Sequence, residues 1–240
     1  MWSICKKEVN QFFSSLTGII AIILFLLING IFLFMLKDSS ILEYGYATLE
    51  KFFDLAPWVL MFLVPSIAMR SFSDEYKSGT FEILRTKPLK ASEIVNGKYI
   101  AILLVVLLAV IPTFIYIYTI SSLSGVGGID AGGIAGSYIG LLLLAATFAA
   151  VSSFCSSLTN NAVAAFLISA FSCLTLYYGF QKLSELESLQ GNADFYIEML
   201  GIDFHYRSIS RGVMDSRDII YFLSIIFLGL TGTIKNIRNR

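Results

Sequence analysis

The chain has 240 residues, of which 56% are hydrophobic and only 14% are charged, and its 17 basic and 17 acidic side chains cancel. Soluble domains are about 25% charged, so this composition excludes a soluble domain and predicts an all-α integral membrane protein. The three cysteines, Cys5, Cys155 and Cys173, lie in or beside apolar runs without a CxxC pair. That placement argues against a disulfide or a metal site and favours a role as small apolar side chains.

The first predicted elements are an interfacial helix and a membrane span. Residues 2–16 place apolar side chains at helical spacing with polar ones between them, which predicts a helix lying in the membrane interface. A signal peptide is the alternative, but the next apolar run is too long and no small-x-small cleavage pattern follows it. That run, 18–36, carries no charge. It predicts the first span, because about 20 residues of helix cross the hydrocarbon core.

The second and third predicted spans, 53–70 and 99–120, contain prolines. Pro57 and Pro65 lie in the second span and Pro112 in the third. Each proline removes a helical hydrogen bond. Ordinary kinking and a bend that lets the helix tilt are both open interpretations. Segment 121–133 has five glycines but no lysine, and the chain lacks GxxxxGK[ST], so we interpret the segment as a surface turn rather than a phosphate-binding loop.

Two further spans, 134–154 and 162–180, are joined by a short uncharged segment and therefore form an antiparallel hairpin. Small residues in the fourth span let helices approach closely, either within the chain or across a subunit contact. We interpret 181–217 as an outer helical segment. Its His205 is the only histidine, which cannot alone form a metal site or a catalytic triad, so we expect a structural role. The sixth span, 218–235, leads into a basic end.

Charge sets the expected orientation. Six spans place both termini on one side, together with the segment 70–98. These three regions hold eleven of the 17 Lys and Arg residues but only five of the 17 acidic residues. Cytoplasmic segments carry an excess of Lys and Arg. We therefore expect 70–98 and both termini in the cytoplasm, with 37–54, 121–133 and 181–217 outside.

Segment 70–98 is the one substantial segment on the predicted cytoplasmic side. Ser73 and Ser92 are candidate helix N-caps, and Gly79 is a candidate break. Between Gly79 and Pro88 we predict a short helix, which the proline ends. Mixed charge with interleaved apolar side chains suits docking against a protein, and a solvated loop that merely obeys the positive-inside rule is the alternative.

The pattern in this segment reads Glu75-x-x-x-Gly79-Thr80-x-Glu82-x-Leu84, then Pro88-Leu89, then Ile94-x-x-Gly97-Lys98. It resembles the loop between spans two and three of ABC-2-type transporter permeases. The resemblance covers the whole chain, and it implies one permease domain over 1–240 with the ABC-2 (type V exporter-like) fold. The amino-acid sequence of residues 74–82 is most similar to that of the gliding-motility-associated GldF subfamily. Many relatives have a basic residue where this chain has Tyr76.

The resemblance implies a multi-pass subunit of the bacterial inner membrane that is not itself an enzyme. No cofactor is expected in this chain, since a separate ABC ATPase would bind ATP and Mg²⁺. A second permease subunit, identical or different, would complete the unit in the lipid bilayer, and no nucleic acid is involved. The loop would seat in a cleft of the ATPase. The implied contact residues are Glu75, Lys77, Gly79, Thr80, Phe81, Glu82, Arg85, Gly97 and Lys98.

Two other classes of protein are alternatives. A membrane-embedded enzyme requires paired ionisable side chains inside the spans, and the six predicted spans hold none well inside. A channel or ion-coupled secondary transporter without an ATPase partner requires intramembrane charge or broken helices in corresponding halves. The three prolines are the only indication of broken helices. We therefore expect export or mechanical work driven by the partner ATPase.

Overall fold

The computed structural model describes residues 1–36, 48–86, 88–124, 129–186, 191, 194–213 and 215–239. The helices over most of the first half are α1 (Trp2–Phe13), α2 (Leu16–Phe34), α3 (Glu50–Ser78), α4 (Thr80–Arg85), α5 (Ala91–Val110), the 3-10 helix η1 (Ile111–Phe114) and α6 (Ile115–Leu123). The remaining helices are α7 (Ala131–Leu158), α8 (Ala162–Leu174), the π-helix η2 (Thr175–Gly179), α9 (Phe180–Ser184), α10 (Asp194–Glu198), α11 (Ile202–Ser210) and α12 (Ser216–Asn239). Most of the predicted loop 37–54, three glycines of the predicted turn 121–133, and Lys87 lie outside the described residues.

Among the described residues, five helices are long and apolar enough to cross a membrane. They are α3, α5 continued through η1 and α6, α7, α8 continued through α9, and α12. Helices α1 and α2 raise the number to six if the bent pair counts as one span. The bend between them is 71°, so α1 runs across rather than along the direction of α2. The expected all-α integral membrane fold is confirmed, and a separate helix, α1, forms over the residues for which the sequence predicts an interfacial helix.

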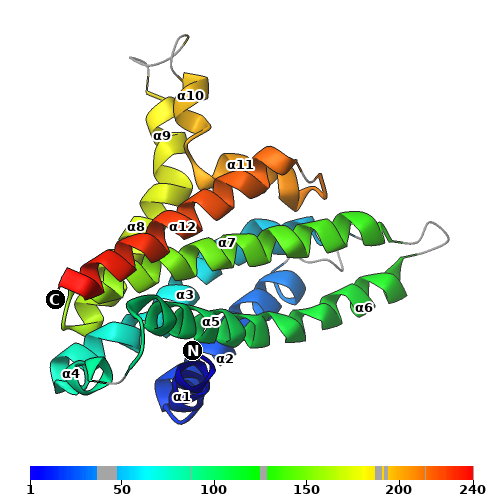
Figure 1. The fold of residues 1–240 in the computed structure, drawn as a ribbon. Coiled ribbons are helices and arrows are strands. Elements are labelled where there is room, and N and C mark those ends of the chain that lie inside the picture. Colours follow the sequence, from blue (N-terminus) through cyan, green and yellow to red (C-terminus); the bar gives the residue numbers. More distant parts are fainter. Residues whose placement is uncertain are drawn as a thin grey trace.

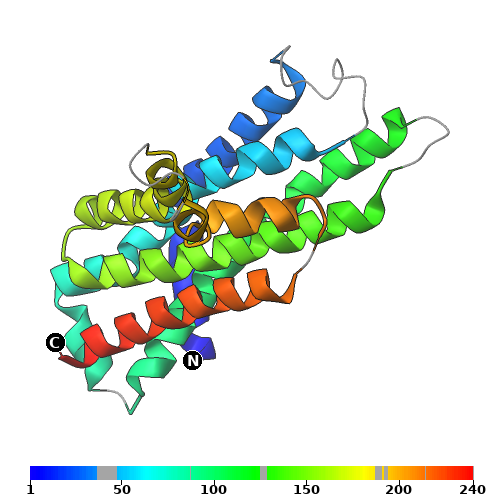
Figure 2. The same cartoon turned by 90° about the horizontal axis from the view of Figure 1, so that it is seen from above.

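Helix α7 lies in the middle of the bundle and packs against α3, α8, α11 and α12 (Figures 1 and 2). Its small residues allow that packing, because glycine lets another helix approach closely. A Cβ placed on Gly140 would lie 2.5 Å from the side chain of Ile209 in α11. A Cβ on Gly229 of α12 would lie 3.1 Å from the backbone of Ala150. The small face of α7 is thus covered by helices of the same chain.

Helix α3 is longer than the sequence predicts for the second span. It is a single helix of 29 residues that contains Pro57 and continues through Ser78. A proline leaves the carbonyl four residues earlier without its helical N–H partner. Here that carbonyl is on Phe53, and it accepts a hydrogen bond of 3.0 Å from the Tyr206 hydroxyl of α11. Side chains of neighbouring helices can satisfy such carbonyls within a membrane, which is how a proline-containing helix remains continuous.

Two predicted helix caps are wrong. Ser73 lies inside α3, where its hydroxyl donates to the carbonyl of Met69 instead of capping a new helix. Helix α5 begins at Ala91, before Ser92, and its first turn is closed by the Lys90 N–H donating to the Glu93 carboxylate at 2.9 Å. Both errors come from placing the end of the second span too early and the start of the third too late.

Candidate functional site

At one end of the bundle, helices α1, α3, α4, α5 and α12 meet around a small apolar core of their own. Its buried members are Ile4, Phe72, Phe81, Ile94, Val95 and Ile237. Ile4 belongs to α1 and Ile237 to α12, so both terminal helices contribute to the core that contains Phe81 of the loop helix α4. The two termini and the loop therefore share one end of the molecule (Figure 1).

The turn from α3 into α4 depends on Gly79. Its φ is +69°, a left-handed conformation that side chains other than glycine rarely adopt, and it ends α3 at Ser78. Helix α4 follows at once and ends at Arg85, before Pro88, so the predicted break and short helix are confirmed. The Phe81 side chain anchors α4, because it is buried with its ring centroid 4.8 Å from that of Tyr76 in α3.

Beside this core, four charged side chains of alternating sign join α1, α3 and α5. The Lys98 side chain is completely buried, and its ammonium lies 2.7 Å from Glu8 Oε1 and 3.0 Å from Glu75 Oε2. It also donates to the carbonyl of Ser71. The other carboxylate oxygen of Glu75 lies 2.8 Å from the Lys7 ammonium. We call Lys7, Glu75, Lys98 and Glu8 the charge quartet.

The charge quartet is electrically neutral, which is what makes its burial tolerable. Removing a charge from water is costly unless partners compensate for it, and truncating one partner leaves another charge buried and unpaired. Burial opposes the charge on Lys7, yet its hydrogen bond to Glu75 and the nearby carboxylates of Glu75 and Glu8 hold the pKa of its ammonium above its ordinary value. The quartet therefore fixes α1 to α3 and α5 only while all four members keep their charge.

Gly97 lets α1 approach close enough for these contacts. A Cβ placed on Gly97 would lie 3.0 Å from the carbonyl oxygen of Met1 and 3.1 Å from Cβ of Ile4. The adjacent Lys98 then holds α1 electrostatically through Glu8. The Gly97-Lys98 pair of the sequence pattern thus acts as a small residue for contact followed by a charged residue for attachment.

The structure divides eight of the nine predicted contact residues into two groups of four. Lys77, Gly79, Thr80 and Glu82 are exposed on the turn and on α4. Glu75, Phe81, Gly97 and Lys98 are buried beneath them against α1, α3 and α5. Arg85 ends α4, and its side chain lies outside the described residues. The apolar Ile83 stands 63% exposed on the same helix, so the outer surface of α4 combines charge with one apolar side chain.

Lys7 and Glu8 are members of the site that sequence reasoning missed. An interfacial helix is expected to direct its charged side chains to water. The available signal was Lys98 itself, because a lysine at the start of an apolar span requires an acidic partner. The spacing of the sequence does not show which acidic residue pairs with Lys98, because Glu8 is 90 residues away in the chain.

His205 belongs to a separate structural contact between α11 and α12. Its Nδ1 lies 2.7 Å from Asp218 Oδ1, its Nε2 lies 3.0 Å from the carbonyl of Met199, and its ring stacks on Tyr221. This is the structural role that the sequence suggests. Within the described parts of the chain, no group of three His, Cys, Asp or Glu side chains could hold a metal ion.

A bundle of helices long and apolar enough to cross a membrane, with a short helical loop fixed at one end, defines a multi-pass all-α membrane protein. A family model described as ABC-2 family transporter protein matches residues 39–194. That match covers well over half of the chain, and the chain belongs to this family. The family and the all-α fold confirm the resemblance drawn from the sequence at the level of an ABC-2 permease. No curated protein matches the chain.

Proposed function

We propose that the chain is the permease subunit of an ABC transporter complex in a bacterial inner membrane, and that a separate ABC ATPase docks on α4. The observation that carries this proposal is the attachment of α4 to the membrane helices. Phe81 inserts α4 into a core shared with α1, α3, α5 and α12, and the charge quartet joins three of these helices, α1, α3 and α5. A force applied to α4 therefore acts on four other helices together.

Helix α3 is long enough to transmit such a force. An α-helix rises 1.5 Å per residue, so 29 residues span about 43 Å, against about 30 Å for the hydrocarbon core. The helix thus runs from the membrane interior to the docking surface without a break. When the ATPases close on nucleotide, movement of α4 would tilt α3 and, through the charge quartet, carry α1 and α5 with it.

The remaining parts of the complex follow from this role. ATP and Mg²⁺ would be bound by the ATPase, and a second permease subunit, identical or different, would complete the assembly. The loop 70–98 and both termini would face the cytoplasm, as the distribution of basic residues favours. We propose that the complex acts in gliding motility, and the amino-acid sequence of residues 74–82 supports this proposal. The complex would then export a substrate or perform mechanical work.

The docking surface can be tested with Glu82→Ala, since Glu82 is exposed on α4 and its loss leaves the helix anchored by Phe81. A charge-assisted hydrogen bond is worth about 1.5–3 kcal/mol, so the variant should bind the ATPase about ten- to a hundredfold more weakly. Co-purification of the ATPase expressed with the chain measures this. Glu198→Ala, at the end of α10 and far from α4 (Figure 1), is the control. Equal ATPase recovery with Glu82→Ala and the control would contradict docking on α4.

A further inference from the structure

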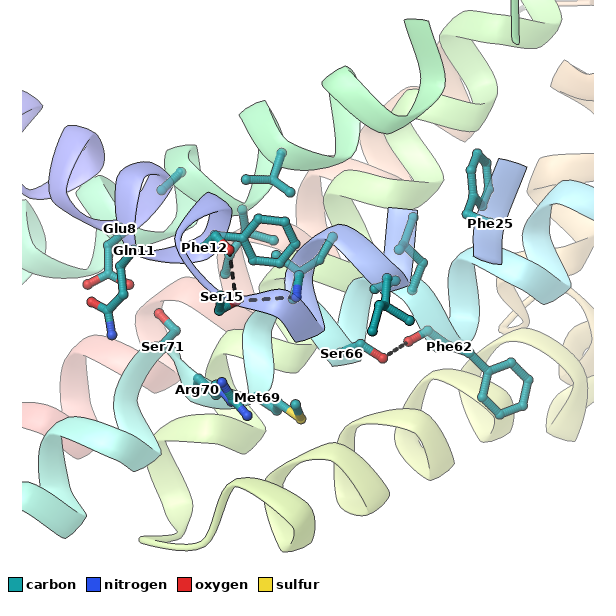
Figure 3. A pocket seen from close by; sticks show the side chains of 18 of the residues that line it. Glu8, Gln11, Phe12, Ser15, Phe25, Phe62, Ser66, Met69, Arg70 and Ser71 are labelled. Atoms are coloured by element: carbon teal, nitrogen blue, oxygen red, sulfur yellow. Dashed lines mark hydrogen bonds between the residues drawn. The ribbon is translucent and has the colours of Figure 1, made fainter. Parts of the chain in front are cut away.

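A cavity of about 520 Å³ opens beside the charge quartet, between α1, α2, α3 and α5 (Figure 3). Its volume falls within the roughly 300–1,000 Å³ of small-molecule sites. Apolar side chains along one side of it are exposed, with Leu24 at 49% and Phe62 at 55%. The cavity is therefore open toward the surrounding lipid at that side, and it lies apart from the exposed surface of α4.

The two ends of the cavity differ in chemistry. Polar side chains gather at the end beside the charge quartet, and Phe25 and Phe62 lie at the opposite end (Figure 3). The lining residues of the polar end are Glu8, Gln11, Arg70, Ser71, Asp74 and Lys98. The apolar wall is built by Ala21, Leu24, Phe25, Ile28, Val59 and Leu63. A ligand that fills the cavity must therefore be an amphiphile.

The polar end contains an unsatisfied hydroxyl. Ser71 is only 5% exposed, and its Oγ has no hydrogen-bond partner among the described residues. A buried hydroxyl without a partner is costly, so a ligand oxygen at this position would remove a penalty. Arg70 lies next to it, with its Nε at 4.0 Å from Asp74 Oδ2 and its side chain 45% exposed. A guanidinium and a hydroxyl together suit a phosphate group.

The length of the cavity suits one acyl chain. Along α3, Arg70 and Val59 are eleven residues apart, which corresponds to about 16 Å of helix. One leaflet is half of a hydrocarbon core about 30 Å thick. A chain that starts beside Arg70 and ends beside Val59 therefore crosses one leaflet, with its polar end at the interface.

We propose that this cavity binds a phospholipid with a phosphoethanolamine headgroup. The phosphate accepts hydrogen bonds from Arg70 and from the Ser71 hydroxyl, and one acyl chain lies along the apolar wall. The headgroup's ammonium pairs with Asp74, whose carboxylate stands beside Arg70. Because Glu8 and Asp74 balance Lys98 and Arg70, the polar end is neutral and favours a zwitterionic headgroup over an anionic one. An apolar helix of a second copy would leave Ser71 without a partner, which argues for a lipid.

The test is native mass spectrometry of the full chain, delipidated in detergent and titrated with phosphatidylethanolamine or phosphatidylglycerol. Ser66→Phe places a ring in the cavity. Ser66→Ala is its matched control, since within the described part of the chain the Ser66 hydroxyl bonds only to the Phe62 carbonyl of its own helix. Arg70→Gln removes the phosphate donor, and Arg217→Gln removes an exposed charge outside the cavity. We expect Arg70→Gln to weaken phosphatidylethanolamine binding about tenfold and Ser66→Phe to abolish it, with both controls unchanged.

Equal lipid binding by the wild type, Ser66→Phe and Arg70→Gln would overturn the proposal, because that lipid would be bulk lipid at the protein surface. Tighter binding of phosphatidylglycerol than of phosphatidylethanolamine would overturn the headgroup assignment. A disulfide between two copies of Leu24→Cys, formed without retained lipid, would show that a second copy covers the cavity. Thermal unfolding verifies that each variant is folded. If Arg70→Gln does not fold, the difference in lipid binding between Ser66→Phe and Ser66→Ala tests the proposal.

Discussion

At the scale of single residues, Lys98 shows how a charged side chain becomes part of the interior. It is fully buried at the point where α1, α3 and α5 meet, and two carboxylates and a backbone carbonyl surround its ammonium. Buried ion pairs contribute little net stability compared with apolar residues, but a broken one is strongly destabilising. The charge quartet is therefore best understood as a device that fixes which helices lie together.

We predict that Lys98→Met destabilises the protein by about 3–5 kcal/mol, because Glu8 and Glu75 would then face each other with no cation between them. Thermal unfolding in detergent measures the change. Lys182→Met is the control, since that lysine forms an exposed pair with Glu185, and it should leave the unfolding temperature unchanged. A similar small change in both variants would mean that the quartet does not hold α1.

A second prediction concerns the carbonyl that Pro57 leaves free. Tyr206→Phe removes the hydroxyl that donates to Phe53 and leaves a buried acceptor without a partner. We expect a loss of about 1–3 kcal/mol in the free energy of unfolding. Tyr118→Phe, at a tyrosine that is 76% exposed, should have no effect. If Tyr206→Phe unfolds at the wild-type temperature, the hydrogen bond does not support the proline-containing helix.

At the scale of elements, the turn at Gly79 was accessible to sequence reasoning and the extent of α3 was not. The turn at Gly79 and the end of the short helix before Pro88 have local causes, because glycine and proline each determine which backbone conformations are possible at or next to their own position. The continuation of α3 to Ser78 depends on contacts from elsewhere in the chain, such as Tyr206 at Pro57 and the core around Phe72. A single sequence does not reveal which distant side chains meet a helix.

We predict that Gly79→Val impairs docking of the ATPase while Gly79→Asn largely preserves it. The left-handed conformation at φ +69° costs an ordinary L-residue about 1–2 kcal/mol, and asparagine adopts it more readily than a β-branched residue. No atom of the described residues lies within 4 Å of a Cβ added at Gly79, so strain and not collision would be responsible. ATPase co-purification compares the two variants. Equal recovery would show that the turn does not set the direction of α4.

At the scale of the whole molecule, the long apolar helices were predictable because each contains a long run of apolar residues with few charges. The described residues form five such helices, or six if the bent pair α1 and α2 counts as one span. The segment 70–98 was predictable as the candidate site from its charge and its family pattern. The division of that site into exposed and buried halves was not predictable. It requires α1 to return against α5, a contact between Glu8 and Lys98 that local spacing does not encode.

The orientation of the molecule gives a further prediction. We expect Thr80→Cys, exposed at the start of α4, to resist an impermeant thiol reagent in intact cells and to react after the membrane is opened. Arg211→Cys, at the other end of the bundle, should react from outside. The background is low because Cys5, Cys155 and Cys173 are all buried. Rapid labelling of Thr80→Cys in intact cells would reverse the topology.

The charge quartet also has a consequence for the order in which the molecule is assembled during synthesis. Lys7 and Glu8 leave the ribosome about 5–20 s before Lys98, at usual rates of about 5–20 residues per second. Until α5 has been synthesised, Glu8 of α1 lacks the buried lysine that it contacts in the folded protein. The helix that is synthesised first therefore reaches its final position late. Docking of α1 requires that α3 and α5, the helices on either side of the loop, are already in position.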